Sequence, residues 1–125
     1  MYSTTVSIEF VAQHYLTVPN PGPEGRPHSH HFRVELTARG PELNEYDYLV
    51  DIDDARAALQ SVADRYRDQL LNDLPEFEGY NPSVERFARV VFDRLTEIVT
   101  DDTVTELRVR IWEEDTAAAT YESTV

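Results

Sequence analysis

Residues 28–39 read HSHHFRVELTAR, and apolar and polar residues alternate strictly from Phe32 to Arg39. The apolar members are Phe32, Val34, Leu36 and Ala38, and the polar members are Arg33, Glu35, Thr37 and Arg39. Successive side chains of a strand point to opposite faces of a sheet, so this alternation predicts a half-buried strand whose apolar face meets a core. We expect the strand to end at Gly40-Pro41, because proline cannot continue a central strand.

The rest of the chain supplies further strands and helices. The same alternation predicts three more strands, at residues 3–14, 104–113 and about 117–124. Apolar residues at helical spacing predict two amphipathic helices, at about 51–70 and 82–99. Asp51 is the expected N-cap of the first helix, and Asn81-Pro82 the cap and first residue of the second. A loop rich in proline and glycine, residues 17–27, joins the first two strands.

The predicted order of elements is therefore ββααββ, in a single domain that spans residues 1–125. Alternating strands favour an antiparallel sheet with one apolar face, and two amphipathic helices can cover that face. This is an α+β fold with a four-stranded antiparallel sheet and two helices on one side. The other side carries charged residues and Trp112, and is either wet or buried against other subunits.

The charge of the chain limits its partners. There are 24 acidic residues against 11 basic ones, all arginine, which gives a net charge of −13. Such a charge argues against nucleic acid or an anionic membrane as a partner. The acids are spread along the chain, which is typical of a solvated acidic surface such as that of proteins adapted to a salty cytoplasm. The chain has no cysteine, which excludes disulfide and thiol chemistry and fits a cytoplasmic location.

The histidines predict a metal site. His28 and His30 are two residues apart on one strand, so their side chains project the same way, roughly 6.5–7 Å apart at the backbone. His14 ends the first strand with the same parity as Phe10, and it approaches them if the two strands form a hairpin. Three histidines around an open position are the layout of a catalytic zinc site. His31 has the opposite parity and is left out. Two histidines in a surface loop would give the same H-x-H pattern without a metal.

Glu113 is the candidate carboxylate. It continues the inward-facing row Leu107, Val109 and Ile111, where a carboxylate is costly unless something pairs with it. A ligand edge with two N–H donors would satisfy it, as an arginine fork does. Alternatively, Glu113 lies past the end of the strand in solvent, or pairs with an arginine.

Several segments, taken in order, resemble 6-pyruvoyl-tetrahydropterin synthases and the related 6-carboxy-tetrahydropterin synthases. Residues 10–16, FVAQHYL, resemble the family's F-x-A-A-H-x-L segment, and residues 28–32, HSHHF, resemble H-G-H-x-Y/F. Val50-Asp51-Ile52 is similar to the V-x-D-F entry to the first helix. Residues 71–75, LNDLP, and residues 81–85, NPSVE, resemble the L-N-D-L-P and N-P-T-x-E run. Glu113 and Tyr121 match the terminal E-T … Y pattern.

The resemblance implies the tunnelling fold, in which subunits join into barrels, commonly trimers stacked as hexamers, with active sites between subunits. It also implies a zinc ion held by His14, His28 and His30. The same likeness implies a pterin whose guanidine-like edge is bound by Glu113. Ser83, in the matching N-P-S run, joins Glu113 as a substrate-binding candidate.

The catalytic residues depart from the family pattern. Members usually carry a cysteine four residues before the first histidine of H-x-H, and this chain has Glu24 there. They also carry an Asp-His pair, and here the aligned positions are Arg67 and Asp68, or Asp68 and Gln69 one residue later. We therefore take Glu24 as the candidate general base and Asp68 as a candidate proton relay. Glu24 could equally be a solvated acid of the loop.

The predicted function is that of a zinc-dependent lyase acting on the side chain of dihydroneopterin triphosphate or dihydroneopterin. Some family members with glutamate in place of the cysteine resemble dihydroneopterin aldolases, which gives one alternative. A homologue that binds metal and pterin without turnover is the other. A triphosphate needs cationic side chains, and the chain has no lysine, although Arg26, Arg65 and Arg67 lie near the predicted site. Unphosphorylated dihydroneopterin therefore stays a candidate substrate.

Overall fold

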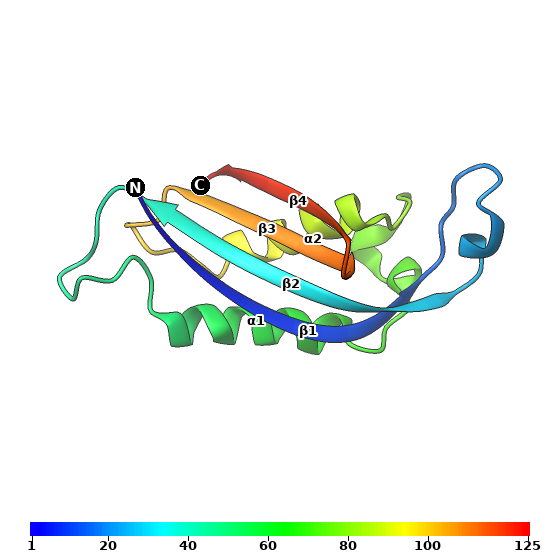
Figure 1. Ribbon diagram of the computed structural model, residues 1–125, viewed down its shortest axis with the longest axis horizontal. Coiled ribbons are helices and arrows are strands. Elements are labelled where there is room, and N and C mark those ends of the chain that lie inside the picture. The colour runs from blue at the N-terminus through cyan, green and yellow to red at the C-terminus, as the bar shows by residue number, and fades with distance from the viewer.

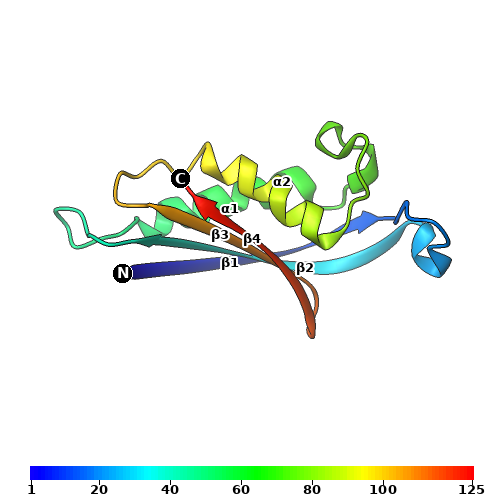
Figure 2. The same cartoon turned by 90° about the horizontal axis from the view of Figure 1, so that it is seen from above.

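The computed structural model describes residues 1–125 as one sheet covered by two helices (Figures 1 and 2). The strands are β1 (Tyr2–His14), β2 (His28–Gly40), β3 (Glu106–Glu114) and β4 (Ala117–Thr124). The helices are α1 (Ile52–Tyr66) and α2 (Val84–Thr96), with short 3₁₀ helices η1 (Gly22–Gly25), η2 (Leu71–Asp73) and η3 (Pro75–Phe77). The sheet order is β1-β2-β3-β4, with every neighbouring pair antiparallel. The predicted ββααββ order and α+β class are confirmed.

Both helices lie on the same face of the sheet, as the view from above shows (Figure 2). The inward residues of the strands and the apolar stripes of the helices form a core of 28 buried residues. Phe87 of α2 stands at one end of this core, with its ring centroid 5.2 Å from both Phe32 of β2 and Tyr66 of α1. Neither helix has the length and apolar character that crossing a membrane would require.

The β1–β2 hairpin extends beyond the other two strands. Its register pairs Val6 with Leu36, Phe10 with Phe32 and His14 with His28. The pairing of β2 with β3 ends at Arg33 and Trp112, so the first residues of β2 pair with β1 alone. The two strands and the η1 loop therefore project at one end of the molecule, away from the chain termini (Figure 1).

The first helix ends earlier than its apolar pattern predicts, at Tyr66 rather than near residue 70. Asp68 takes a left-handed conformation with φ of 60°, and its N–H donates to the carbonyl of Val11 at 2.7 Å. The N–H of Gln13 donates in turn to the carbonyl of Gln69 at 2.9 Å. Pairing with the end of β1 thus replaces the last helical turn, a long-range interaction that overrides local propensity.

The second helix begins two residues later than predicted. Its N-cap is Ser83, whose hydroxyl accepts from the N–H of Arg86 at 3.1 Å. Asn81 is not the cap, and its side-chain oxygen accepts instead from the N–H of Thr17 at 2.9 Å. The helix ends at Thr96 rather than at residue 99. Residues 81–83 are thereby free to lie against the end of β1.

An ionic cluster joins α1, η3 and α2. The Glu76 carboxylate receives two hydrogen bonds from Arg65, at 2.8 and 3.2 Å, and one from the hydroxyl of Tyr66 at 2.8 Å. Arg94 lies 3.7 Å from the same carboxylate. The Arg65 hydrogen bonds are the main cause that lowers the pKa of Glu76 to about 2, whereas burial raises the pKa of Tyr66 to about 12. The three elements are held together by one partly exposed carboxylate.

Replacing this carboxylate is expected to destabilise the fold in a pH-dependent way. The folded pKa of Glu76 is depressed, so its contribution is present above its unfolded pKa and is lost as the pH falls from about 5 towards 2. Glu76→Gln should cost on the order of 2 kcal/mol at pH 7 after allowance for solvent screening, lowering Tm by roughly 5–10 °C. Thermal unfolding at pH 7 and pH 3 measures this difference.

The matched control is Glu78→Gln, an exposed neighbour, which should leave Tm unchanged. An equal Tm deficit for Glu76→Gln at both pH values would contradict the assignment.

Candidate metal centre

Three histidine side chains meet at the projecting end of the hairpin. His14 is the last residue of β1 and lies directly opposite His28, the first residue of β2, while His30 follows on the same face. The ring centroids are 4.6 Å apart for His14 and His28, 4.9 Å for His28 and His30, and 5.1 Å for His14 and His30. The structure thus brings together the residues that strand parity selected. His31 points to the other face, where it lies 3.7 Å from Glu9.

The nitrogens that face the centre make no hydrogen bond within the protein. Nδ1 of His14 donates to the carbonyl of Pro82 at 2.8 Å, and Nδ1 of His28 to that of Arg26 at 2.8 Å. A carbonyl only accepts, so both Nδ1 atoms carry the proton and both Nε2 atoms hold a free lone pair. The Nε2 atoms of His14, His28 and His30 are buried without a hydrogen bond. Unpaired buried polar atoms are costly, and a shared cation would satisfy all three.

The environment of His14 keeps it neutral. Burial lowers the pKa of His14, the hydrogen bond to the Pro82 carbonyl opposes that shift, and the nearby imidazoles of His28 and His30 lower it further. A neutral imidazole is the form that binds a metal. The lowered pKa of His14 and the hydrogen bond of its Nδ1 therefore both favour a neutral ring whose Nε2 can bind a metal.

Two asparagine side chains fix the chain just after His14. The amide of Asn72 accepts from the N–H of Tyr15 at 3.0 Å and donates to its carbonyl at 2.9 Å. Asn81 accepts from the N–H of Thr17 at 2.9 Å. Together with the Pro82 carbonyl, these contacts hold the end of β1 and the ring of His14 against the start of α2, as partners behind metal ligands commonly do. The sequence analysis did not predict that these asparagines position His14. Their only signal in the sequence is that Asn72 and Asn81 belong to the L-N-D-L-P and N-P-S segments.

Glu113 approaches the histidines from β3. Its Oε1 lies 2.9 Å from Nε2 of His30 and 3.6 Å from Nε2 of His14, and its side chain is 26% exposed. One ring nitrogen of each histidine and a carboxylate oxygen of Glu113 all lie within 4.8 Å of one another. Nitrogen and carboxylate ligands of this number suit a divalent ion such as zinc. The Glu113 carboxylate is therefore paired with this cluster and not with an arginine.

The other sequence-predicted residues lie around this cluster rather than in it. Glu24 is exposed in η1, and its backbone carbonyl accepts from the N–H of Leu16 at 2.8 Å, two residues after His14. Its charge is close enough to raise the pKa of His14, against the larger lowering by burial. The hydroxyl of Ser83 is engaged in capping α2, next to Pro82. The side chain of Asp68 is exposed and outside the cluster.

Glu113 lines two hollows, and neither of them is lined by a histidine of the cluster. One, of about 540 Å³, lies on the uncovered face of the sheet and is lined by Glu9, His31, Arg33, Trp112, Glu113, Glu114 and Asp115. The other, of about 350 Å³, lies between the start of α2 and β4 and is lined by Val84, Glu85, Glu113 and residues 117–120. A small ligand can therefore reach the Glu113 carboxylate from either side.

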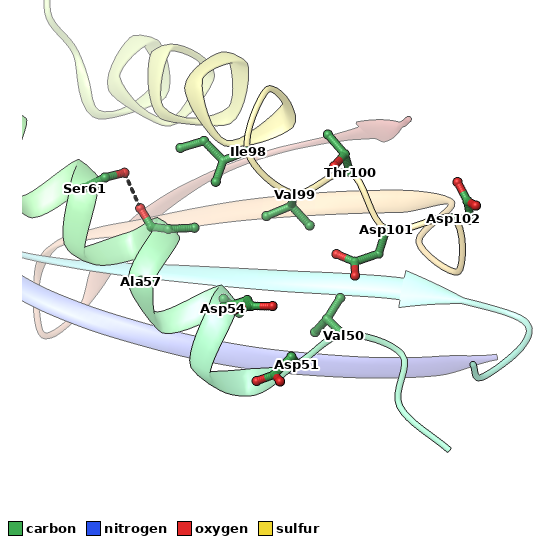
Figure 3. A pocket seen from close by; sticks show the side chains of 12 residues that line it. Val50, Asp51, Asp54, Ala57, Ser61, Ile98, Val99, Thr100, Asp101 and Asp102 are labelled. Carbon is green, nitrogen blue, oxygen red and sulfur yellow. Dashed lines mark hydrogen bonds between the residues drawn. The ribbon is translucent and has the colours of Figure 1, made fainter. Parts of the chain in front are cut away.

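The largest hollow, of about 650 Å³, lies elsewhere. It is bounded by the start of α1 and the residues after α2, at the end of the sheet away from the histidines (Figure 3). Its ionisable residues are four aspartates, Asp51, Asp54, Asp101 and Asp102. One of these, Asp51, already caps α1 by accepting from the N–H of Asp53. This hollow has no group that could share chemistry with the histidine cluster.

The fold is shared with solved pterin enzymes. The Caenorhabditis elegans 6-pyruvoyl tetrahydropterin synthase superposes with a TM-score of 0.83 at 18% identity, over 98% of this chain and 95% of that one. The Plasmodium falciparum synthase gives 0.78 at 15% identity, over 98% and 99%. A Plasmodium vivax synthase in which a catalytic glutamate is replaced by alanine gives 0.79 at 14% identity, over the whole of both chains.

The sequence matches a family model along almost its entire length. The model is that of 6-pyruvoyl tetrahydropterin synthase, and it matches residues 3–124, which include every histidine of the cluster and Glu113. The chain belongs to the 6-pyruvoyl tetrahydropterin synthase family.

Proposed function

We propose that this protein is a zinc-dependent lyase that breaks a carbon–oxygen or carbon–carbon bond in the side chain of a dihydropterin. The observation that carries the proposal is the set of three buried, unpartnered Nε2 atoms facing one point beside Glu113. Family membership supports a lyase of this kind. Zinc bound there would polarise the side-chain hydroxyls of the substrate and lower their pKa.

Glu113 is the proposed anchor for the pterin. Its carboxylate oxygens can accept two parallel N–H bonds from the guanidine-like edge of a pterin, in the geometry that arginine offers. The hollows on both sides of Glu113 have the room for a bicyclic ring. Ser83 is the proposed second contact, because it directly precedes Val84, which lines one of these hollows together with Glu113.

Glu24 is the proposed general base. The hydrogen bond from Leu16 to its backbone carbonyl ties η1 to the segment that follows His14, which keeps this side chain near the cluster. A relative with the same fold, the Plasmodium vivax synthase, is described with a catalytic glutamate. In the reaction, the Glu24 carboxylate would take a proton from the substrate side chain and hold it for return to the product.

We also propose a homo-oligomer, a trimer or hexamer, with sites between subunits. β1 and β4 are edge strands, each paired on one side only, and the sheet face opposite the helices is uncovered. Open strand edges are templates for pairing with another copy. Within one chain Asp68 lies outside the cluster, so its proposed role as a proton relay requires a site shared with a neighbouring subunit. Light scattering should therefore give three or six times the chain mass of 14.4 kDa, and a monomer at micromolar concentration would contradict the proposal.

The metal site is tested by elemental analysis of the dialysed protein. We expect one zinc ion per chain. His14→Ala, His28→Ala and His30→Ala should each weaken binding by at least ~10-fold, because each removes one nitrogen ligand. His31→Ala is the matched control, since that ring faces away, and it should bind as the parent does. A His30→Ala variant that retains stoichiometric zinc would exclude this site.

The reaction is tested by incubating the metal-loaded protein with dihydroneopterin triphosphate or dihydroneopterin at high salt and identifying products by mass spectrometry. We expect turnover of one of them. Glu24→Gln should lower kcat by roughly 10²- to 10⁴-fold while zinc content stays unchanged, because only proton transfer is lost. Glu42→Gln, an exposed glutamate in the loop after β2, is the control. Unchanged turnover in Glu24→Gln rules out this base, and turnover of neither substrate rules out the enzyme.

A further inference from the structure

We propose that Glu113 closes the metal site in the absence of substrate, as a fourth protein ligand, and leaves the ion when it binds the pterin. This inference rests on the proposed function, because it assigns the same carboxylate a second state. In this proposal, binding of the substrate opens a coordination position on the ion.

The distances around Glu113 are those of ligands on a common ion. Two ligands of a tetrahedral ion with bonds of roughly 2.0–2.1 Å lie about 3.3 Å apart. Oε1 of Glu113 is 2.9 Å from Nε2 of His30 and 3.6 Å from Nε2 of His14, on either side of that value. Although the first separation is short, Nε2 of His30 makes no hydrogen bond, so the two atoms are not directed at each other. They face a shared point.

Glu113 lies in a β-bulge, where its strand is not paired with β4. β3 pairs Trp112 with Ala118 and Glu114 with Ala117, and Glu113 between them has no partner on β4. A bulge inserts one unpaired residue and re-aims its side chain. It also lies just beyond the last β2–β3 pair, Arg33 with Trp112, so no strand register holds it on either side. The carboxylate of Glu113 thus lies beside the histidines, while its backbone is not paired with either neighbouring strand.

The two roles of Glu113 compete for the same oxygens. A fork of two N–H donors needs both carboxylate oxygens, whereas an ion at the cluster needs at least one of them. Hollows adjoin Glu113 on two sides, so the side chain has space to rotate from the cluster to a ligand. A catalytic zinc keeps one position for water or substrate, and release of Glu113 would create it. The ion is then closed to water until a pterin arrives.

The first test compares metal affinity in Glu113→Gln with that in Glu114→Gln. Glu114 is the adjacent strand residue, is exposed, and its carboxylate accepts a side-chain hydrogen bond from Thr116 alone, so it is a matched control. Competition with a chromophoric chelator for Co²⁺ should show at least ~10-fold weaker binding in Glu113→Gln, because an anionic ligand is lost, and no change in Glu114→Gln. Circular dichroism of the metal-free variants establishes that both fold. Parent-like affinity in a folded Glu113→Gln overturns the proposal, while the loss of metal in His30→Ala would still support the proposed site.

The second test uses the unaltered protein loaded with Co²⁺. Azide binds an open position of the ion and changes its visible spectrum. We expect weak azide binding to the free protein and at least ~5-fold tighter binding once neopterin, an oxidised pterin, is present, since binding that releases a ligand is coupled to binding at the released position. Azide affinity that is independent of neopterin, with neopterin shown to bind by its fluorescence, overturns the proposal without touching the proposed lyase activity.

Discussion

The register of the β1–β2 hairpin places His14 opposite His28, and the two-residue period of β2 adds His30 on the same face. A shift by one residue would turn a whole row of side chains to the other face of the sheet. The register is held because the same face buries Phe10 and Phe32, whose apolar rings would be exposed by such a shift. The same register therefore buries the core and brings the imidazoles together. The candidate metal site continues the core to the end of the hairpin.

Side-chain amides and one backbone carbonyl position the part of the site that lies beyond the paired strands. His14 lies at the end of β1, where the ladder stops, and Asn72, Asn81 and the Pro82 carbonyl take over its positioning. These groups come from the segment between α1 and α2, which is fixed in turn by the cluster around Glu76. The helices thus contribute to the site without supplying a ligand. The hydrogen bonds of these groups oppose the cost of leaving three imidazole nitrogens buried without a hydrogen bond.

The sequence was sufficient for whatever depends on periodicity. Strand parity selected His14, His28 and His30, excluded His31 and placed Glu113 on the inner face, because a period of two fixes the direction of each side chain. Prediction from the sequence failed where long-range contacts compete with the local preference for a helix. The last turn of α1 is replaced by pairing of residues 67–70 with β1, and Asn81 contacts Thr17 instead of capping α2. The support from Asn72 spans 57 positions along the chain, which no local pattern reveals.

The proposed base, Glu24, lies in the part of the site that this fold leaves free to vary. Glu24 is attached through its backbone carbonyl, which accepts from Leu16 whatever side chain the residue carries. Any residue at this position would be delivered to the same place near His14, whereas a histidine of the cluster cannot change without losing a lone pair at the centre. A chain can therefore exchange the cysteine of the resembling enzymes for a glutamate and keep the loop, the register and the metal ligands. Differences in chemistry among these proteins are then expected in η1 rather than in the strands, because loops carry function on a scaffold that strands hold rigid.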